Sequence, residues 1–235
     1  MSNIVIETKD LCKVYEGVVP VNAVDHVSLI IEKGEFTSVV GPSGSGKTTL
    51  LNIVGGLDRP TSGSVKVHGQ ELNGLSENQL INFRLKHIGF VFQSFNLIPV
   101  LSAKENAEFI MLLQNIPKQE RNQRVETLLN EVGLADKLNS RPSELSGGQQ
   151  QRVAVARALA SKPDFVLADE PTANLDGKSA ANLLDIMERL NHEEGVTFIF
   201  STHDQRVIER AHRVITLEDG KVVSDVKHNP HTHQR

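Results

Sequence analysis

The sequence predicts an α/β protein with one mostly parallel β-sheet, and three short apolar segments carry this prediction. The segments are residues 36–40, 165–168 and 197–201, and each runs directly into a polar turn, as buried parallel strands do. Ligands on such sheets bind beyond the carboxyl ends of the strands. We therefore expect the chemistry of this protein in the polar motifs that follow these three segments.

The other predicted elements surround this sheet. Residues 1–36 and roughly 60–92 have the short strands and turn signals of antiparallel structure, and residues 95–160 are mainly helical. The strands expected outside the three apolar segments are 4–6, 27–31, 64–67 and 88–92. The expected helices are 47–55, 118–132, 147–161, 178–194 and 205–211.

Charge and cysteine content exclude several classes of protein. The chain has 235 residues, 25 Lys+Arg, 29 Asp+Glu and a net charge of −4, whereas dedicated nucleic-acid-binding domains are usually basic. Its longest stretch without a charged residue or His, 88–103, contains polar residues and is too short to span a bilayer. Cys12 is the only cysteine, so a reducing compartment fits best. We expect a cytoplasmic protein that binds no nucleic acid.

A glycine-rich segment follows the first predicted parallel strand. Residues 41–48 match the phosphate-binding pattern G-x-x-x-x-G-K-[ST] in full, between a predicted strand and a predicted helix. The backbone N–H groups of such a loop surround a β-phosphate, and the helix N-terminus adds about half a positive charge. We expect Lys47 to reach the β- and γ-phosphates and the Thr48 hydroxyl to bind Mg²⁺. The predicted phosphate-binding residues are Gly41, Pro42, Ser43, Gly44, Ser45, Gly46, Lys47, Thr48 and Thr49.

Two carboxylates end the second predicted parallel strand. Asp169 fits a metal-side role, and Glu170 fits a base that polarises an attacking water. A divalent cation is required, because a nucleoside triphosphate with a charge of about −4 and two carboxylates would otherwise face only Lys47 and a helix end. His203 follows the third strand, where its ring can reach the γ-phosphate.

A second glycine cluster, the sequence LSGGQ at 145–149, opens the predicted helix 147–161. Ser146 and Gln149 form the S-x-x-Q pattern of a capping box. A cap does not need two successive glycines, and each weakens the first turn by roughly 1 kcal/mol relative to Ala. A bare helix N-terminus is a good phosphate site. Because the chain already has one such site, the second makes sense for a nucleotide held by another copy.

Taken in order, these motifs resemble those of the ATP-binding cassette (ABC) ATPases. The matching segments are the Walker A motif at 41–48, Gln93 at the Q-loop position, the LSGGQ signature at 145–149, the Walker B motif at 165–170, Asn174-Leu175-Asp176 and His203. The resemblance covers essentially the whole chain. A narrower resemblance, to the LolD/MacB type, is carried by residues 51–63, 88–99 and 145–152. That type serves permeases with large extracytoplasmic domains.

The resemblance implies a P-loop NTPase (RecA-like) core with a parallel sheet, an antiparallel β subdomain and an inserted α-helical subdomain. Residues 1–235 would then form a single nucleotide-binding domain. Its expected parts are the antiparallel β subdomain with the P-loop in 1–92, the helical subdomain with the signature in 93–160, and the rest of the core with the tail in 161–235.

The resemblance also implies a homodimer that forms on ATP binding. Each ATP would lie between the Walker A motif of one copy and the signature of the other, and Asp176 would couple the two sites. The signature residues acting in trans would be Ser146, Gly147, Gly148 and Gln149.

Individual roles follow from the same resemblance. The implied catalytic residues are Glu170, His203 and Gln93, and the implied Mg²⁺ residues are Thr48, Gln93 and Asp169. Gln93 would also relay to a membrane partner near residues 94–102. Tyr15 matches the aromatic position that stacks on adenine, with an ordinary half-buried aromatic side chain as the alternative. His228, His231 and His233 in the tail could bind metal, but a polar chain end is the favoured interpretation.

The implied function is ATP hydrolysis that powers a separate, FtsX/MacB-like membrane permease from the cytoplasmic face of the inner or plasma membrane. MacB carries a fused membrane domain that we do not find in this sequence, so the arrangement is closer to LolD. LolD/MacB-type export, lipoprotein release and mechanical work on the envelope are the leading roles. An importer-type cassette is the closest alternative. A soluble ABC ATPase acting on ribosomes or DNA is less favoured, and the signature argues against a simple P-loop kinase or GTPase.

Overall fold

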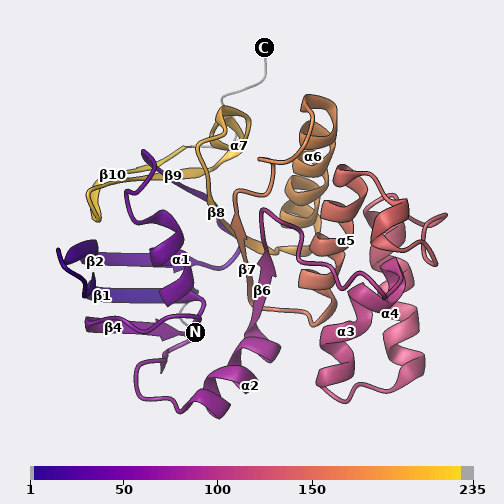
Figure 1. Cartoon of the computed structure of the whole chain (residues 1–235), viewed down its shortest axis with the longest axis horizontal. Helices are drawn as coiled ribbons and strands as arrows, with labels where there is room; N and C mark the ends of the chain where they lie inside the picture. Colours follow the sequence, from indigo (N-terminus) through magenta and orange to yellow (C-terminus); the bar gives the residue numbers. More distant parts are fainter. Residues whose placement is uncertain (1–2, 229–235) are drawn as a thin grey trace.

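The structure is a computed structural model, and it describes residues 3–228. These residues form two β-sheets with helices around them, the smaller antiparallel sheet lying on one side of the larger sheet and a group of helices on the other (Figure 1). The α/β class predicted from the sequence is therefore confirmed. No helix within residues 3–228 is both long enough and apolar enough to cross a membrane.

The larger sheet has six strands in the order β10-β9-β3-β8-β7-β6. The three apolar segments of the sequence form its adjacent strands β3 (Phe36–Val40), β8 (Thr197–Ser201) and β7 (Phe165–Asp169), which run parallel. Every residue of β8 is buried, and so is all of β3 and β7 except the last residue of each. Because both faces of these strands are covered, they read as continuous apolar runs rather than as alternating patterns.

The strand pairing of residues 88–92 corrects one expectation. The antiparallel sheet, in the order β2-β1-β4-β5, ends at residue 71, and β6 (Ile88–Val91) instead pairs in parallel with β7. The prediction of an antiparallel part extending to residue 92 was therefore wrong. Helix α2 (Glu77–His87), which the sequence analysis also missed, lies between β5 and β6 along the chain and begins with a capping box at Ser76. The remaining bounds are β1 Ile4–Tyr15, β2 Val21–Glu32, β4 Ser62–Val67 and β5 Gln70–Glu71.

Two further strands at the other edge of the larger sheet were also missed. These are β9 (Arg213–Glu218), parallel to β3, and β10 (Lys221–Lys227), antiparallel to β9. Asp219 and Gly220 join them with φ values of 47° and 79°, as in a type I′ hairpin turn. An Asp-Gly pair is a hairpin signal, but the many charged residues of these strands weaken their alternating pattern.

Helices pack on both faces of the larger sheet. Helix α1 lies between the two sheets, whereas α3, α4 and α5 pack together on the far side of the larger sheet (Figure 1). The bounds are α1 Lys47–Val54, α3 Ala103–Leu113, α4 Lys118–Glu131, α5 Gly147–Ala160, α6 Gly177–Glu194 and α7 Gln205–Arg210, with a 3₁₀ turn at Pro142–Glu144. The five helices predicted from the sequence are all present, with ends within one residue of the prediction.

Two hydrophobic clusters hold the layers together, one on each face of the larger sheet. On β8, Phe198 and Phe200 belong to the cluster that includes the helical group. Ile199, between them, belongs to the cluster with α1 and the antiparallel sheet. Successive side chains of a strand point to opposite faces, so this sheet is the shared wall of both clusters. The carboxyl ends of β3, β7 and β8 are thereby fixed side by side.

Candidate functional site

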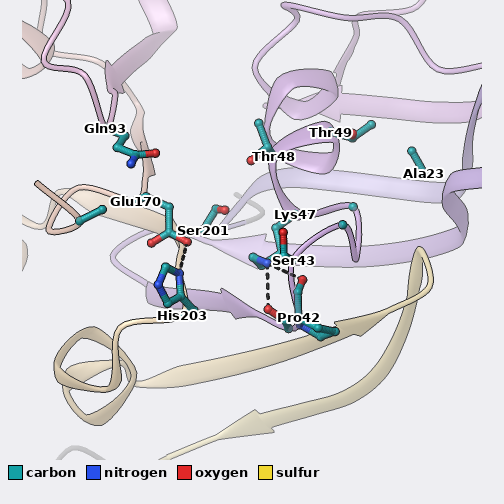
Figure 2. A pocket seen from close by; sticks show the side chains of 14 residues that line it. Ala23, Pro42, Ser43, Lys47, Thr48, Thr49, Gln93, Glu170, Ser201 and His203 are labelled. Carbon is teal, nitrogen blue, oxygen red and sulfur yellow. Dashed lines mark hydrogen bonds and ion pairs between the residues drawn. The ribbon is translucent and has the colours of Figure 1, made fainter.

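A pocket of about 550 Å³ is lined by the segments that follow the carboxyl ends of β3, β7 and β8 (Figure 2). Predicted site residues from separate parts of the chain meet there: the glycine-rich loop after β3, Gln93 after β6, Glu170 after β7 and His203 after β8. The lining residues are Ala23, Gly41, Pro42, Ser43, Gly44, Gly46, Lys47, Thr48, Thr49, Gln93, Glu170, Ala173, Ser201 and His203. Ser45 is buried and is not among these lining residues.

Close backbone approaches shape the glycine-rich loop. Gly41 and Gly46 have φ values of 147° and 98°. A Cβ atom on Gly46 would lie 2.0 Å from the carbonyl oxygen of Ala23, and one on Gly41 would lie 2.1 Å from that of Leu217. Only glycine fits such contacts, so the loop is held between β2 and β9.

Lys47, the first residue of α1, lies within the loop. Its Nζ donates hydrogen bonds to the carbonyl oxygens of Gly41 and Pro42 at 2.8 and 2.9 Å (Figure 2). The start of α1 has no side-chain cap, so its first N–H groups are open to an anion. Among the described residues that line the pocket, Lys47 is the only Lys or Arg. This end of the pocket therefore fits a phosphate chain.

Thr48 and Asp169 form an oxygen-rich pair beside the loop. The Thr48 Oγ1 lies 3.2 Å from each carboxylate oxygen of Asp169. The Gln93 side chain points into the pocket from the opposite wall (Figure 2). Hydroxyl, carboxylate and amide oxygens are the ligands that Mg²⁺ prefers, so this donor set fits the predicted ion.

Glu170 is held by the loop after β8. His203 Nδ1 lies 2.7 Å from its Oε1 (Figure 2), and Thr202 Oγ1 donates to its Oε2 at 3.1 Å. Glu170 also has a φ of 47°, a strained value that persists only where the surroundings enforce it. Its N–H donates to the Ser201 carbonyl at 2.8 Å. The predicted base therefore has one fixed orientation and keeps the predicted histidine beside it.

Asp204 ties the loop after β8 to the loop after β7. Hydrogen bonds from Arg206 are the main cause that lowers the pKa of its carboxyl to about 2. Thr172 Oγ1 donates to Asp204 Oδ2 at 2.6 Å. Asp204 also caps α7 by accepting from the Arg206 N–H at 3.0 Å. These bonds fix His203 relative to Glu170, and the sequence analysis did not identify them.

The Q-loop is held through its backbone carbonyl groups. Arg157 of α5 donates to the carbonyl oxygens of Phe95, at 2.8 Å, and Asn96. Both of these residues have positive φ, 59° and 50°. Burial lowers the pKa of the Arg157 guanidinium, and the backbone carbonyl groups of the loop offset part of the cost of burying this charge.

Two amide side chains extend this network toward Gln93. Asn174 donates to the Gln93 carbonyl at 3.0 Å, and Gln151 of α5 donates to the Phe92 carbonyl at 3.4 Å. The backbone of Gln93 is thus anchored to α5 and to the loop after β7 while its side chain faces the pocket. The sequence analysis gave no role to Arg157 or Gln151, because a hydrogen bond to a carbonyl leaves no motif.

The signature segment begins α5 but does not line the pocket. The capping box predicted from the sequence is confirmed: Ser146 N–H donates to Gln149 Oε1 at 2.8 Å, and Gln149 N–H donates to Ser146 Oγ at 3.3 Å. A Cβ on Gly148 would lie 2.8 Å from Ser179 Cβ, whereas one on Gly147 would meet no described heavy atom closer than 3.5 Å. Packing within the chain therefore explains Gly148 but not Gly147.

Asp176 caps α6 next to the signature. It accepts hydrogen bonds from the N–H groups of Lys178 and Ser179, each at 3.0 Å, and from Ser179 Oγ at 2.6 Å. The Ser179 bond is the main cause that lowers the pKa of the Asp176 carboxyl. Because Ser179 also touches the Gly148 position, Asp176 and the start of α5 are mechanically linked.

Tyr15 lies beside Thr49 rather than in the wall of the pocket. Its hydroxyl donates to Asp58 Oδ2 at 2.8 Å, and its side chain is exposed. Burial is the largest cause that raises the pKa of its hydroxyl. Because Thr49 lines the pocket, the Tyr15 ring beside it lies where it could stack on the base of a nucleotide at the edge of the pocket. Of the tail histidines, His231 and His233 lie outside the described residues.

Comparisons with known proteins agree with this geometry. The family described as "ABC transporter" matches residues 24–173. An uncharacterized ABC transporter ATP-binding protein of Thermotoga maritima is 47% identical over 219 residues, which cover 93% of each chain. The macrolide export ATP-binding/permease protein MacB of Campylobacter jejuni is 47% identical over 220 residues, 93% of this chain but only 34% of that relative.

A solved structure, a dimeric post-hydrolysis state of the ATP-binding cassette MJ0796 bound to ADP and Pi, is 42% identical in sequence. It superimposes with a TM-score of 0.88 and covers 95% of this chain and 99% of that one. A second solved structure of the same protein, described as the dimeric structure of a bacterial ABC transporter cassette, has the same TM-score of 0.88 and 43% identity.

The Asp204 contacts predict a pH effect on stability. A carboxyl whose pKa falls on folding stabilises the protein above its ordinary pKa, and this contribution is lost as the pH falls toward the folded value. With a folded value of about 2, the loss occurs from about pH 4 downward. In Asp204→Asn, which keeps a good helix cap, the free energy of unfolding should fall less steeply as the pH decreases over this range. The difference between the two slopes should correspond to at most one bound proton. Urea unfolding of both proteins at several pH values measures this, and parallel curves would refute the assignment.

Proposed function

The chain belongs to the ABC transporter family as an ATP-hydrolysing cassette, and from this premise we propose that it works as a head-to-tail homodimer that drives a separate membrane permease. The family match and the relatives establish the ATPase class. We propose the roles of the individual residues, the formation of the dimer and the separate permease.

The proposed transporter is of the LolD/MacB type, with an FtsX/MacB-like permease and the ATPase on the cytoplasmic face of the membrane. The MacB relatives, named for macrolide export, support this type, and the chain spans about a third of their length. An ATP-binding protein of Methanocaldococcus jannaschii is 48% identical to this chain, and the match covers 97% of that relative. A relative of about this length supports a permease on another chain. In the segment 94–102, Val100 is 72% exposed, which suits contact with such a partner. An importer-type cassette is the alternative.

We propose that the chain acts as one nucleotide-binding domain. The antiparallel sheet and the P-loop would hold the base and the phosphates, and α3 to α5 would carry the signature. The larger sheet would supply the catalytic carboxylates. Tyr15 beside Thr49 supports adenine stacking at the rim of the pocket.

In the proposed reaction, the loop N–H groups and Lys47 bind the β- and γ-phosphates of ATP, and Lys47 exchanges its bonds to Gly41 and Pro42 for phosphate oxygens. Thr48, Asp169 and Gln93 would hold Mg²⁺, which neutralises phosphate charge when bound. Glu170 accepts a proton from the attacking water. His203, on the exposed side of Glu170, holds that carboxylate and contacts the γ-phosphate.

One observation carries the proposed dimer: the N-terminus of α5 has the features of a phosphate site yet lies outside the pocket of its own chain. Helix N–H groups attract anions, and Gly147 leaves this end free of a side chain although its own chain has room for one. A phosphate approaching from another copy would use that space. The similar cassette structures are described as dimeric, which supports a dimer of this chain.

The proposed base can be tested by changing its charge alone. Glu170→Gln should keep ATP binding and slow hydrolysis by about 100-fold or more, the usual scale for a lost general base. Phosphate release measures hydrolysis, and calorimetric titration measures ATP binding. The matched control is Glu218→Gln on the exposed end of β9, which should hydrolyse at the normal rate. A Glu170→Gln rate within twofold of normal would contradict the assignment.

The two signature glycines should respond differently. Gly147→Asp should leave the thermal unfolding temperature unchanged or raise it, because a carboxylate suits the first turn of a helix, yet lower hydrolysis at least about tenfold by repelling the phosphate. Gly148→Ala should destabilise the fold by about 1–3 kcal/mol through overpacking against Ser179. Gly148→Ala should cost less in a Ser179→Gly background than in the unchanged chain, because Ser179→Gly removes the clash although it also loses the hydrogen bond to Asp176. Full hydrolysis by Gly147→Asp would contradict a role in trans.

A further inference from the structure

A group of metal-type side chains lies on β1 and β2, outside the pocket lining. Cys12, Asp25 and His26 each offer one ligand atom, and these atoms all lie within 4.8 Å of one another. None of the three lines the ATP pocket. The chain has no other cysteine. The proposed function gives this group no task.

Two β-bulges bring the group together. The register between β1 and β2 shifts on both sides of Leu11, with one extra residue first in β1 and then in β2. Asp10 and His26, one in each bulge, have φ values of 48° and 53°. A bulge re-aims the side chains next to it, and a regular ladder would place neighbouring residues of each strand on opposite faces. The bulges therefore let residues of both strands converge.

The two ring nitrogens of His26 face different carboxylates. Nδ1 lies 2.6 Å from Asp10 Oδ1, and Nε2 lies 3.6 Å from Asp25 Oδ1. A histidine that binds a metal usually donates its other ring N–H to a carboxylate, which fixes the tautomer and the ring orientation. Asp10 supplies that partner. The distance of 3.6 Å suits two atoms bound to one ion at about 2.0–2.2 Å each.

Contacts with neighbouring groups hold Cys12 and Asp25 beside His26. The N–H of His26 donates to Cys12 Sγ at 3.3 Å, and that Sγ in turn donates to the Asp10 carbonyl oxygen at 3.6 Å. Lys221 Nζ lies 3.3 Å from Asp25 Oδ2, so it offsets charge at one oxygen and leaves Oδ1 toward His26. Thiolate, imidazole and carboxylate together suit Zn²⁺ and similar transition metals rather than Mg²⁺ or Ca²⁺.

We propose that Cys12, Asp25 and His26 form a binding site for one zinc-type divalent ion, with Asp10 as the residue that orients His26. Three protein ligands leave a fourth position for water. The site is separate from the Mg²⁺ position proposed beside Thr48 and does not take part in ATP hydrolysis. It would cross-link the two longest strands of the antiparallel sheet close to Ala23, whose carbonyl contacts the Gly46 position.

Titration of the reduced chain with Co²⁺ tests this proposal. Because Cys12 is the only cysteine, a thiolate-to-cobalt charge-transfer band in the near ultraviolet reports this site alone. We expect one Co²⁺ per chain to produce the band and Zn²⁺ to abolish it. Cys12→Ser should remove the band, and Asp10→Asn should weaken binding about 10- to 100-fold. His68→Gln, an exposed histidine outside the group, is the control and should not change it.

Thermal unfolding with and without Zn²⁺ gives a second readout that does not depend on the colour of cobalt. The unfolding temperature of the unchanged protein should rise with Zn²⁺, and that of Cys12→Ser should not. Co²⁺ binding without the thiolate band, as by the histidines of the tail, would overturn the proposal. An equal Zn²⁺-induced rise in Cys12→Ser would do the same.

Discussion

The functional pocket depends on one steric constraint, the close approach of neighbouring backbone to the glycine-rich loop. The positions of Gly41 and Gly46 have no room for a side chain, because carbonyl groups of β9 and β2 lie against them. These strands belong to the two different sheets. The loop is therefore held where the two sheets meet. This position fixes the orientation of the loop N–H groups, of Lys47 and of the start of α1.

The other half of the pocket depends on hydrogen bonds between loops. Glu170 is held by Thr202 and His203, and Asp204 connects the same loop to Thr172. The backbone of Gln93 and its neighbours is anchored to α5 and to Asn174. Since α5 also begins with the signature, a displacement of that helix would reach Gln93 through these bonds. These bonds form a physical connection between the start of α5, where the proposed second copy would bind, and Gln93.

The sequence predicted the parts of the fold and site that have a strong local pattern. The three buried strands were predicted from continuous apolar runs that end in polar turns, the five helices from their helical patterns, and the loop at 41–48 from its complete glycine motif. Strands β9 and β10 were missed because charged residues weaken their alternation, and β6 was assigned to the wrong kind of pairing because strand direction has no local pattern. Arg157 and the steric reason for Gly148 depend on contacts distant in sequence.

We propose that a second copy completes the ATP site. Light scattering of Glu170→Gln with ATP and Mg²⁺ tests it most directly, because slow hydrolysis should keep the closed form populated. If a second copy completes the site, the particle mass should be twice that of one chain with ATP and that of a single chain without it. Adding Lys47→Ala to the same chain should prevent the change by weakening phosphate binding. A single-chain mass for Glu170→Gln at saturating ATP would show that a second copy does not complete the ATP site.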